Sequence, residues 1–535
     1  MIRIVTLFLF LFIISPAVVS AADRNFVTLV IPVRGREYWR QSKDISQLEF
    51  IKTAVESSRH PSTWLIQYDA LTDNQIVSSL NSISSAIELG LFLEVTRNLA
   101  LDSFVNYPWE TEKWERADKI FLSGYSPQDR FKLIDTAFNR FKNKFGFYPA
   151  SVGSWYIDSR SLAYIHDQYH VQAVLGVSDQ YLTDGYQLWG QYVGEPYYPS
   201  LNSSLEPASD PRNKIDIVKV QWASREPLLS YGAGVKFSNF SVQVNDYARY
   251  HNLDQKYLDR LIRIYTTDLT IPLAQITLGV EVGELEEKFL PQFKDQLQAV
   301  SRLGLQAVTM SKFASEYQKI YPDTSPSMTI TSAIDNRAIT WYQSPLYRSA
   351  VLTENGQSRL VDLRYYHSSR FYDNDWTQAD SRQNLYRVVP AVIDQIGLGN
   401  YQPADFPISP PPPIHDYLPV KISSIDKLKQ ALYKLVPDIR TSKLNGRWII
   451  GLTVSPEKLC LMKCTTFRYP TLEAFLGLRR FLRPDMKIYA AWQDTLPNPL
   501  PGELVIKNSL YGIENLATEL SMPKLFENSL YQISR

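Results

Sequence analysis

Carboxylate side chains stand directly after several short apolar runs in the amino-terminal half of the chain. Each run is rich in β-branched residues, as buried strands are, and residues that follow parallel strands converge at one end of a barrel. Two such carboxylates can act as acid and base on a neutral, hydroxyl-rich substrate. The candidate catalytic residues are Glu281, Asp69, Glu94 and Asp158, and we expect Glu281 to pair with Asp69 or Glu94.

A second signal is the long loop after the fifth apolar run. Residues 161–211 contain no Lys or Arg but many acidic and aromatic residues. Aromatic rings can stack on the apolar face of a sugar while carboxylates accept its hydroxyl hydrogens. We therefore expect residues 180–200 to roof a cleft, with Trp189 exposed to it. The candidate substrate-binding residues are Arg34, Trp155, Asp179, Trp189, Tyr192, Trp222, Arg225 and Asp246.

Structural roles are the alternative for the same residues. Asp69 and Asp158 precede helical segments and fit the N-cap position. The aromatic rings of the loop could instead pack it onto the scaffold. His166 and His170 lie four residues apart on one helical face, but a zinc site needs further ligands. We predict no bound metal and no cofactor.

These candidates depend on a scaffold in which strands and helices alternate. Seven or eight apolar runs lie within residues 26–321, and amphipathic helical segments separate them. One such segment, residues 129–145, ends at Gly146 as a helix with a glycine C-cap does. The alternation predicts an α/β fold with a seven- or eight-stranded parallel β/α barrel. An open doubly wound sheet is the alternative, although no Gly-rich phosphate loop follows any run.

Two segments resemble the glycoside hydrolase/deacetylase β/α-barrel superfamily, which includes polysaccharide deacetylases and family 57 glycoside hydrolases. Residues 90–96 (GLFLEVT) are similar to a family 57 strand with a central Glu, and residues 147–155 (FYPASVGSW) to a segment that enters a central strand. The resemblance implies a carbohydrate-active barrel. Deacetylases carry paired Asp on the first strand, where this chain reads Ile31-Pro32-Val33-Arg34. We therefore expect a mechanism that uses carboxylates without a metal.

The rest of the chain divides by composition. We expect a signal peptide at residues 1–21, a small β-rich domain at 326–401 with a hairpin at Asn355-Gly356, a Pro-rich linker at 402–419 and a mixed α/β domain at 420–535. The apolar run at residues 4–14 is too short to span a bilayer. Cys460 and Cys464 form a local disulfide or two free thiols.

Charge balance narrows the function. The chain has 56 Lys plus Arg and 55 Asp plus Glu, so it lacks the basic surface of a nucleic-acid-binding protein. We expect an exported protein, periplasmic or extracellular, with no integral membrane segment after signal cleavage. Its expected partner is an oligo- or polysaccharide, which it hydrolyses. The alternatives are a non-catalytic glycan-binding or cell-envelope scaffold protein and a divergent polysaccharide deacetylase.

Overall fold

The computed structural model describes most of the chain up to residue 394 and four strands beyond it. The described residues are 24–83, 86–108, 113–183, 186–231, 239–269, 271–366, 379–381, 385–389 and 391–394, followed by 439–444, 447–452, 486–492 and 502–508. The expected signal peptide, Pro-rich linker, cysteine pair and most of residues 420–535 lie outside these ranges. Of the described helices, none combines the length and the apolar character that crossing a bilayer requires.

Eight parallel strands form one nearly closed sheet. Their order is β10-β1-β2-β3-β4-β5-β8, and β9 also pairs with β1. The strands are β1 (Arg24–Val33), β2 (Ser62–Gln67), β3 (Ile87–Phe92), β4 (Ser151–Gly153), β5 (Ala173–Val177), β8 (Val218–Trp222), β9 (Leu273–Leu278) and β10 (Gln306–Val308). Every pairing among them is parallel. The parallel barrel expected from the sequence is therefore present, and the open sheet is not.

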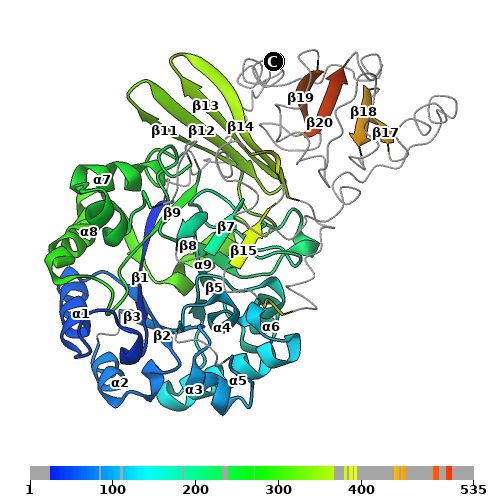
Figure 1. The fold of residues 1–535 in the computed structure, drawn as a ribbon. Helices are drawn as coiled ribbons and strands as arrows, with labels where there is room; N and C mark the ends of the chain where they lie inside the picture. Colours follow the sequence, from blue (N-terminus) through cyan, green and yellow to red (C-terminus); the bar gives the residue numbers. More distant parts are fainter. Residues whose placement is uncertain are drawn as a thin grey trace, which may run out of the picture.

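Helices surround this sheet (Figure 1). They are α1 (Ser46–Ser58), α2 (Asn74–Asn81), α3 (Arg97–Asp102), α4 (Ala117–Ile120), α5 (Pro127–Phe145), α6 (Ser159–Tyr169), α7 (Gln255–Ile264), α8 (Leu290–Arg302) and α9 (Met310–Ile320). Helix α5 shows why they form: Ser126 caps its first turn, Pro127 begins it, and Gly146 ends it in the left-handed conformation at φ 84°. Its Leu133, Phe138 and Phe141 are buried against the barrel.

Alternation along each strand decides what fills the barrel. Gly153 faces Leu65 and Leu175 in the interior, so Gln67, two positions further along β2 than Leu65, points toward the same axis. Glycine is required at Gly153 because a Cβ there would lie 2.5 Å from Leu65. The apolar middle of the barrel thus separates two polar layers, one at each end.

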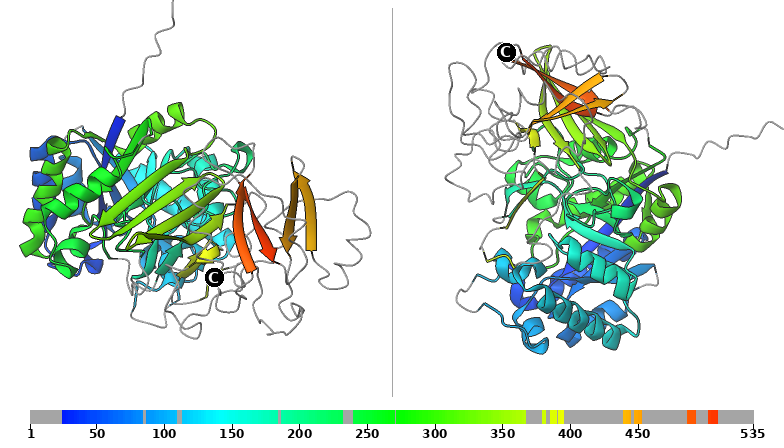
Figure 2. Two further views of the ribbon diagram at one scale, coloured as in Figure 1. Left: turned by 90° about the horizontal axis from the view of Figure 1, so that it is seen from above. Right: turned by 90° about the vertical axis from the view of Figure 1, so that its right-hand side faces the viewer.

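An antiparallel sheet follows the barrel in sequence and packs on it. Its strands are β11 (Met328–Ile334), β12 (Arg337–Ser344), β13 (Tyr347–Glu354), β14 (Gln357–Tyr365) and β16 (Ala391–Asp394). Figures 1 and 2 show this sheet against the part of the barrel that holds β7 (Tyr186–Trp189) and β8. Asn355 and Gly356 form the tight turn between β13 and β14, both with positive φ, as the sequence predicts.

The loop after β5 joins the two parts. Strand β6 (Gln180–Thr183) pairs with β7, and β7 pairs in turn with β15 (Leu385–Val388). Trp341 of β12 donates a hydrogen bond to the carbonyl of Pro227, and Val193 donates to the Gln343 side chain. Beyond residue 394 the described strands form two hairpins, β17 (Ile439–Leu444) with β18 (Arg447–Leu452) and β19 (Met486–Trp492) with β20 (Gly502–Asn508).

Candidate functional site at the barrel mouth

Arg34 is the centre of a charged cluster at the carboxyl ends of three barrel strands. It follows β1, whereas Glu94 comes soon after β3 and Glu281 after β9. Nε and Nη2 of Arg34 donate to the two carboxylate oxygens of Glu94 at 2.7 and 2.8 Å, and Nη1 donates to Glu281 at 2.5 Å. Gln67, the last residue of β2, also donates to Glu94 at 2.9 Å. The structure thus brings together two predicted catalytic residues and one predicted binding residue.

Close backbone contact between β9 and β1 places Glu281. Gly279 has φ 148°, and a Cβ there would lie 1.9 Å from the carbonyl oxygen of Val30, so only glycine fits. The chain then returns to β1, where the amide of Val282 donates to the carbonyl of Pro32 at 3.0 Å. Gly283, at φ 85°, packs against the buried ring of Trp39. These contacts fix the backbone on both sides of Glu281.

Burial separates the roles of the two glutamates. The Glu94 side chain is fully buried, whereas 22% of the Glu281 side chain is exposed. Burial lowers the pKa of Arg34, but the charges of Glu94 and Glu281 raise it, and the balance leaves it well above its usual value. Arg34 therefore stays charged. Glu94 positions Arg34, and Glu281 is the member of the cluster that a ligand can reach.

Aromatic rings enclose the Arg34 guanidinium. Its central carbon lies 5.3 Å from the ring centre of Phe92 and 5.5 Å from the ring centres of both Trp114 and Trp155. These distances suit cation–π contacts. Trp114 and Trp155 are only partly buried, so both offer ring surface at the mouth. Trp222 is buried and packs 5.7 Å from Trp155, which makes it a support for that ring.

Asp69 belongs to a second polar group beside the first. Its carboxylate accepts hydrogen bonds from the hydroxyls of Tyr38 at 2.9 Å and Thr96 at 3.1 Å. It makes no side-chain capping bond to the short 3-10 helix that follows it, so the alternative of a helix cap fails for this residue. The Tyr38 ring lies 5.0 Å from the ring of Trp114, which links the Asp69 group to the aromatic wall around Arg34.

Glu37 joins Asp69 and was missed by the sequence analysis. A Cβ on Gly35 would lie 2.7 Å from a Glu37 carboxylate oxygen and 2.8 Å from the Asp69 Cβ, so glycine allows the two acidic side chains to crowd together. Glu37 is exposed on one side, and partial desolvation together with the hydrogen bond and negative charge of Asp69 raises its pKa, although a backbone hydrogen bond opposes the shift. Glu37 follows no apolar run directly, because three residues of loop separate it from β1. The strand-end pattern therefore could not find it.

The predicted roof of the cleft has a different role. Trp189 is 1% exposed and Tyr192 is fully buried, so the expectation that Trp189 faces a cleft is wrong. The ring of Trp189 lies 5.0 Å from that of Tyr231, and the Tyr192 hydroxyl donates to the carbonyl of Pro326. The loop is covered by the antiparallel sheet, which is why its rings serve packing.

Asp179 and Arg225 lock this loop in place. Asp179 is fully buried, pairs with Arg348 of β13 and accepts from the amide of Gly190 at 2.9 Å. Arg225 donates to the Asp179 carbonyl at 3.0 Å and pairs with Asp246 at 3.1 Å. Contrary to the sequence-based expectation, the Asp179 carboxylate is satisfied by Arg348 and Gly190, and Arg225 pairs with Asp246, which leaves little for a substrate.

Asp158 is also a structural residue. Its carboxylate accepts from the amide of Ser161 at 2.9 Å, which caps α6, and pairs with Arg130 at 3.0 Å. Both side chains of the pair are fully buried. The alternative of a helix cap therefore holds for Asp158, and the expectation of a catalytic role for it is corrected.

The arrangement does not suit a divalent metal at the mouth. The cationic guanidinium of Arg34 occupies the position between Glu94 and Glu281, where it would repel a second cation. His166 and His170 lie in the last turn and the C-cap of α6, whereas Asp158, the N-cap of that helix, lies at the end beside the mouth. Within the described ranges, no three His, Cys, Asp or Glu side chains are grouped as metal ligands would be.

Comparison with known proteins adds a family match and a shared fold. Residues 121–260 match a family described as "Domain of Unknown Function with solved-structure structure (DUF3863)". No curated protein matches the chain. A crystal structure of a candidate glycoside hydrolase/deacetylase from Parabacteroides distasonis superposes with a TM-score of 0.52 at 15% identity, covering 78% of this chain and 98% of that one.

More distant likenesses involve deacetylases. A candidate polysaccharide deacetylase from Mycobacterium smegmatis has a TM-score of 0.34 at 11% identity and covers 57% of this chain and 95% of its own. The peptidoglycan deacetylase PdaC from Bacillus subtilis has a TM-score of 0.28 at 9% identity, covering 56% and 95%. The resemblance seen in the sequence is thus confirmed at the level of the fold: the chain has the β/α barrel of the glycoside hydrolase/deacetylase protein from Parabacteroides distasonis.

Proposed function

We propose that this protein is an exported carbohydrate-active hydrolase that cleaves glycosidic bonds at the barrel mouth. One observation carries the proposal. Glu281 is a partly exposed carboxylate, held by a buried arginine and lying beside partly exposed tryptophan rings. Tryptophan rings bind the apolar face of a sugar, and a fixed carboxylate can act on the bond next to it. The shared β/α barrel supports the same class of protein.

The two acidic groups at the mouth have environments suited to different roles. Glu37 has a raised pKa and so holds its proton more readily than an ordinary glutamate, with Asp69 as its partner. Glu281 pairs with a cation instead. Pairs of carboxyl groups in unlike environments are typical of acid–base catalysis. We assign the proton donor to Glu37 and the opposing carboxylate to Glu281.

The carbon–oxygen bond at the anomeric carbon breaks, and the departing sugar oxygen takes the proton of Glu37. Glu281 accepts a proton from the water that adds to the anomeric carbon, and the two protonation states are restored by exchange with solvent. Arg34 and Glu94 hold Glu281 in place and take no part in proton transfer.

The experiment is a panel of polysaccharides incubated with purified protein, with new reducing ends and free acetate measured in the same samples. We expect reducing ends without acetate, no loss of activity with a chelator, and a fall of about 10²–10⁴-fold in Glu281→Gln. Acetate release that a chelator abolishes would replace this proposal by the deacetylase alternative. Retention of glycans without either product would favour the glycan-binding alternative.

A further inference from the structure

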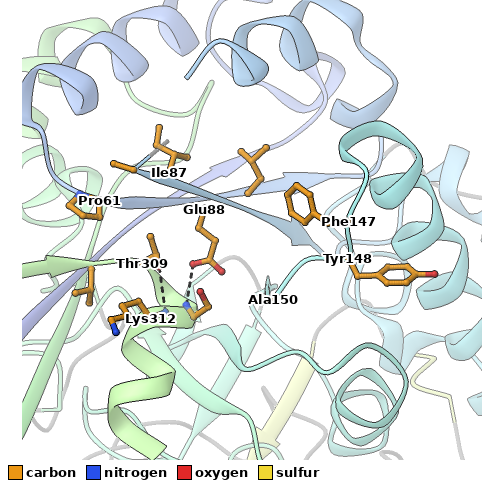
Figure 3. A pocket seen from close by; sticks show the side chains of 12 residues that line it. Pro61, Ile87, Glu88, Phe147, Tyr148, Ala150, Thr309 and Lys312 are labelled. Atoms are coloured by element: carbon orange, nitrogen blue, oxygen red, sulfur yellow. Dashed lines mark hydrogen bonds between the residues drawn. The ribbon is translucent and has the colours of Figure 1, made fainter. Parts of the chain in front are cut away.

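A second site lies at the opposite end of the barrel from Glu281. A pocket of about 530 Å³ opens near the amino-terminal ends of β3 and β4 and the first turn of α9 (Figure 3). Its lining combines apolar residues with Glu88, Thr309, Ser311 and Lys312. We propose that this pocket binds a sugar unit of a polysaccharide, separately from the mouth where the chemistry takes place.

The floor of the pocket is a carboxylate held by three separate elements. One oxygen of Glu88 accepts from the hydroxyl of Ser151 at 2.5 Å. The other accepts from the hydroxyl of Thr63 and from the amide of Ser311, each at 3.1 Å. A carboxylate offers about four acceptor positions, so about one remains for a ligand. Glu88 is only partly buried, and Figure 3 shows its carboxylate at the centre of the pocket.

An exposed aromatic ring forms one wall. The side chain of Phe147 is 48% exposed although it lies between a helix end and a strand. Figure 3 shows Phe147 beside the pocket and the Tyr148 ring extending away from it. Tyr148 is already engaged, since its hydroxyl donates to Asn139 at 3.2 Å and Lys142 lies 4.5 Å from its ring centre. Phe147 packs against Phe141 and Phe145, with ring centres 5.6 and 6.5 Å apart, but about half of it stays exposed and can contact a ligand.

The chemistry of the lining selects a sugar over other small molecules. The Phe147 ring suits the C–H face of a sugar, while Glu88 accepts a hydroxyl hydrogen. Lys312 pairs with Glu316 at 3.0 Å but is 60% exposed at the rim, and its remaining N–H groups can donate to a hydroxyl oxygen. A purely apolar ligand would make no use of the remaining acceptor position of Glu88. The amino-terminal end of a β/α barrel ordinarily carries stabilising contacts, and here it also holds a pocket lined by a fixed carboxylate and a half-exposed ring.

The test measures retardation of the protein in gels that contain each polysaccharide, in the Glu281→Gln background so that no substrate is consumed. Phe147→Ala should weaken retention at least about tenfold, or about 1.4 kcal/mol. Lys312→Ala should weaken it by a smaller factor. Phe104→Ala is the matched control, because Phe104 is 94% exposed and does not line the pocket. Melting temperatures of all variants verify that they are folded.

Two outcomes overturn the proposal: retention unchanged in both Phe147→Ala and Lys312→Ala, or equal loss in Phe147→Ala and Phe104→Ala. Loss of self-association in Phe147→Ala, with retention intact, would assign the surface to a second copy of the chain instead. The proposal stands apart from the catalytic one. If no polysaccharide is cleaved but retention depends on Phe147, only the catalytic proposal fails. If a short oligosaccharide is cleaved equally by wild type and Phe147→Ala, the mouth works without the pocket, as we expect.

Discussion

Two arginine–carboxylate clusters lie at the carboxyl ends of the barrel strands, and they differ in what covers them. Arg34 binds Glu94 and Glu281, and Glu281 remains partly exposed. Arg348 binds Asp179 and Asp362, and all three side chains are fully buried under the antiparallel sheet. Each arginine keeps a strongly raised pKa because two carboxylates outweigh the effect of burial.

The difference shows that a carboxylate at a strand end is not by itself a functional residue. Glu281 and Asp179 both follow an apolar strand closely and both pair with a buried arginine. The antiparallel sheet supplies Arg348 from β13 and Asp362 from β14, and so closes one side of the barrel mouth. The side formed by β1, β3 and β9 keeps an accessible carboxylate. Function therefore depends on which strand ends the second sheet leaves uncovered.

The largest expected effect is on catalysis by the partly exposed cluster around Arg34. Glu281→Gln keeps the shape of the side chain but removes the carboxylate, so turnover of a cleaved glycan should fall by about 10²–10⁴-fold. The melting temperature should fall less than in a variant of the buried Arg348 cluster, because part of the Glu281 side chain is exposed to solvent. Initial rates and thermal unfolding measured on one preparation test both statements. A variant with full activity would show that Glu281 is not catalytic.

In the fully buried cluster around Arg348, a substitution should lower the stability of the fold. Asp179→Asn leaves the buried Arg348 with one carboxylate fewer and should lower the free energy of unfolding by about 3–5 kcal/mol. Glu354→Gln is the control, since Glu354 pairs with the part-exposed Arg337 and such a pair contributes about 0–1 kcal/mol. Denaturant unfolding compares the two variants. If both variants lost similar free energies of unfolding, the buried pair would contribute no more stability than the exposed pair.

Two tryptophans allow a second comparison between the exposed and the buried parts of the barrel mouth. Trp155 is partly exposed beside Arg34, so Trp155→Ala should raise KM about tenfold for a glycan substrate with a smaller change in kcat. Trp189 is buried, so Trp189→Ala should lower stability by about 3–5 kcal/mol while KM of the folded protein stays the same. Steady-state kinetics and thermal melts separate the two. A raised KM in Trp189→Ala alone would restore the loop as part of the binding cleft.

The smallest expected effect is a pH dependence from Glu37. Its pKa is raised in the folded protein by burial and by Asp69, so protonation favours the folded state. The stabilising contribution is complete at low pH, below the unfolded value of about 4.3, and is lost as pH rises through the raised value. The melting temperature of wild type relative to Glu37→Gln should therefore decrease modestly from pH 4 to pH 7. A constant difference across that range would contradict the proposed carboxyl pair.

Local patterns in the sequence determined the scaffold. Alternating apolar runs and amphipathic segments indicated the parallel barrel, Gly146 marked the end of α5, and Asn355-Gly356 marked a hairpin. These features depend on neighbours within a few residues, which is why one sequence is enough to see them. The convergence of Arg34, Glu94 and Glu281 also followed from their places at strand ends, since parallel strands point their carboxyl ends the same way.

Only the tertiary structure decided which of these residues a ligand can reach. The sequence of residues 180–200 gives no indication that β13 and β14 cover this loop. Its aromatic and acidic residues therefore predicted a cleft, whereas in the structure they are buried in a core. Glu37 reaches Asp69 only because of the turn at Gly35, and the pocket at Glu88 draws on residues far apart in sequence. Burial and long-range pairing arise from how elements pack, and such packing is not encoded in any single short stretch of the chain.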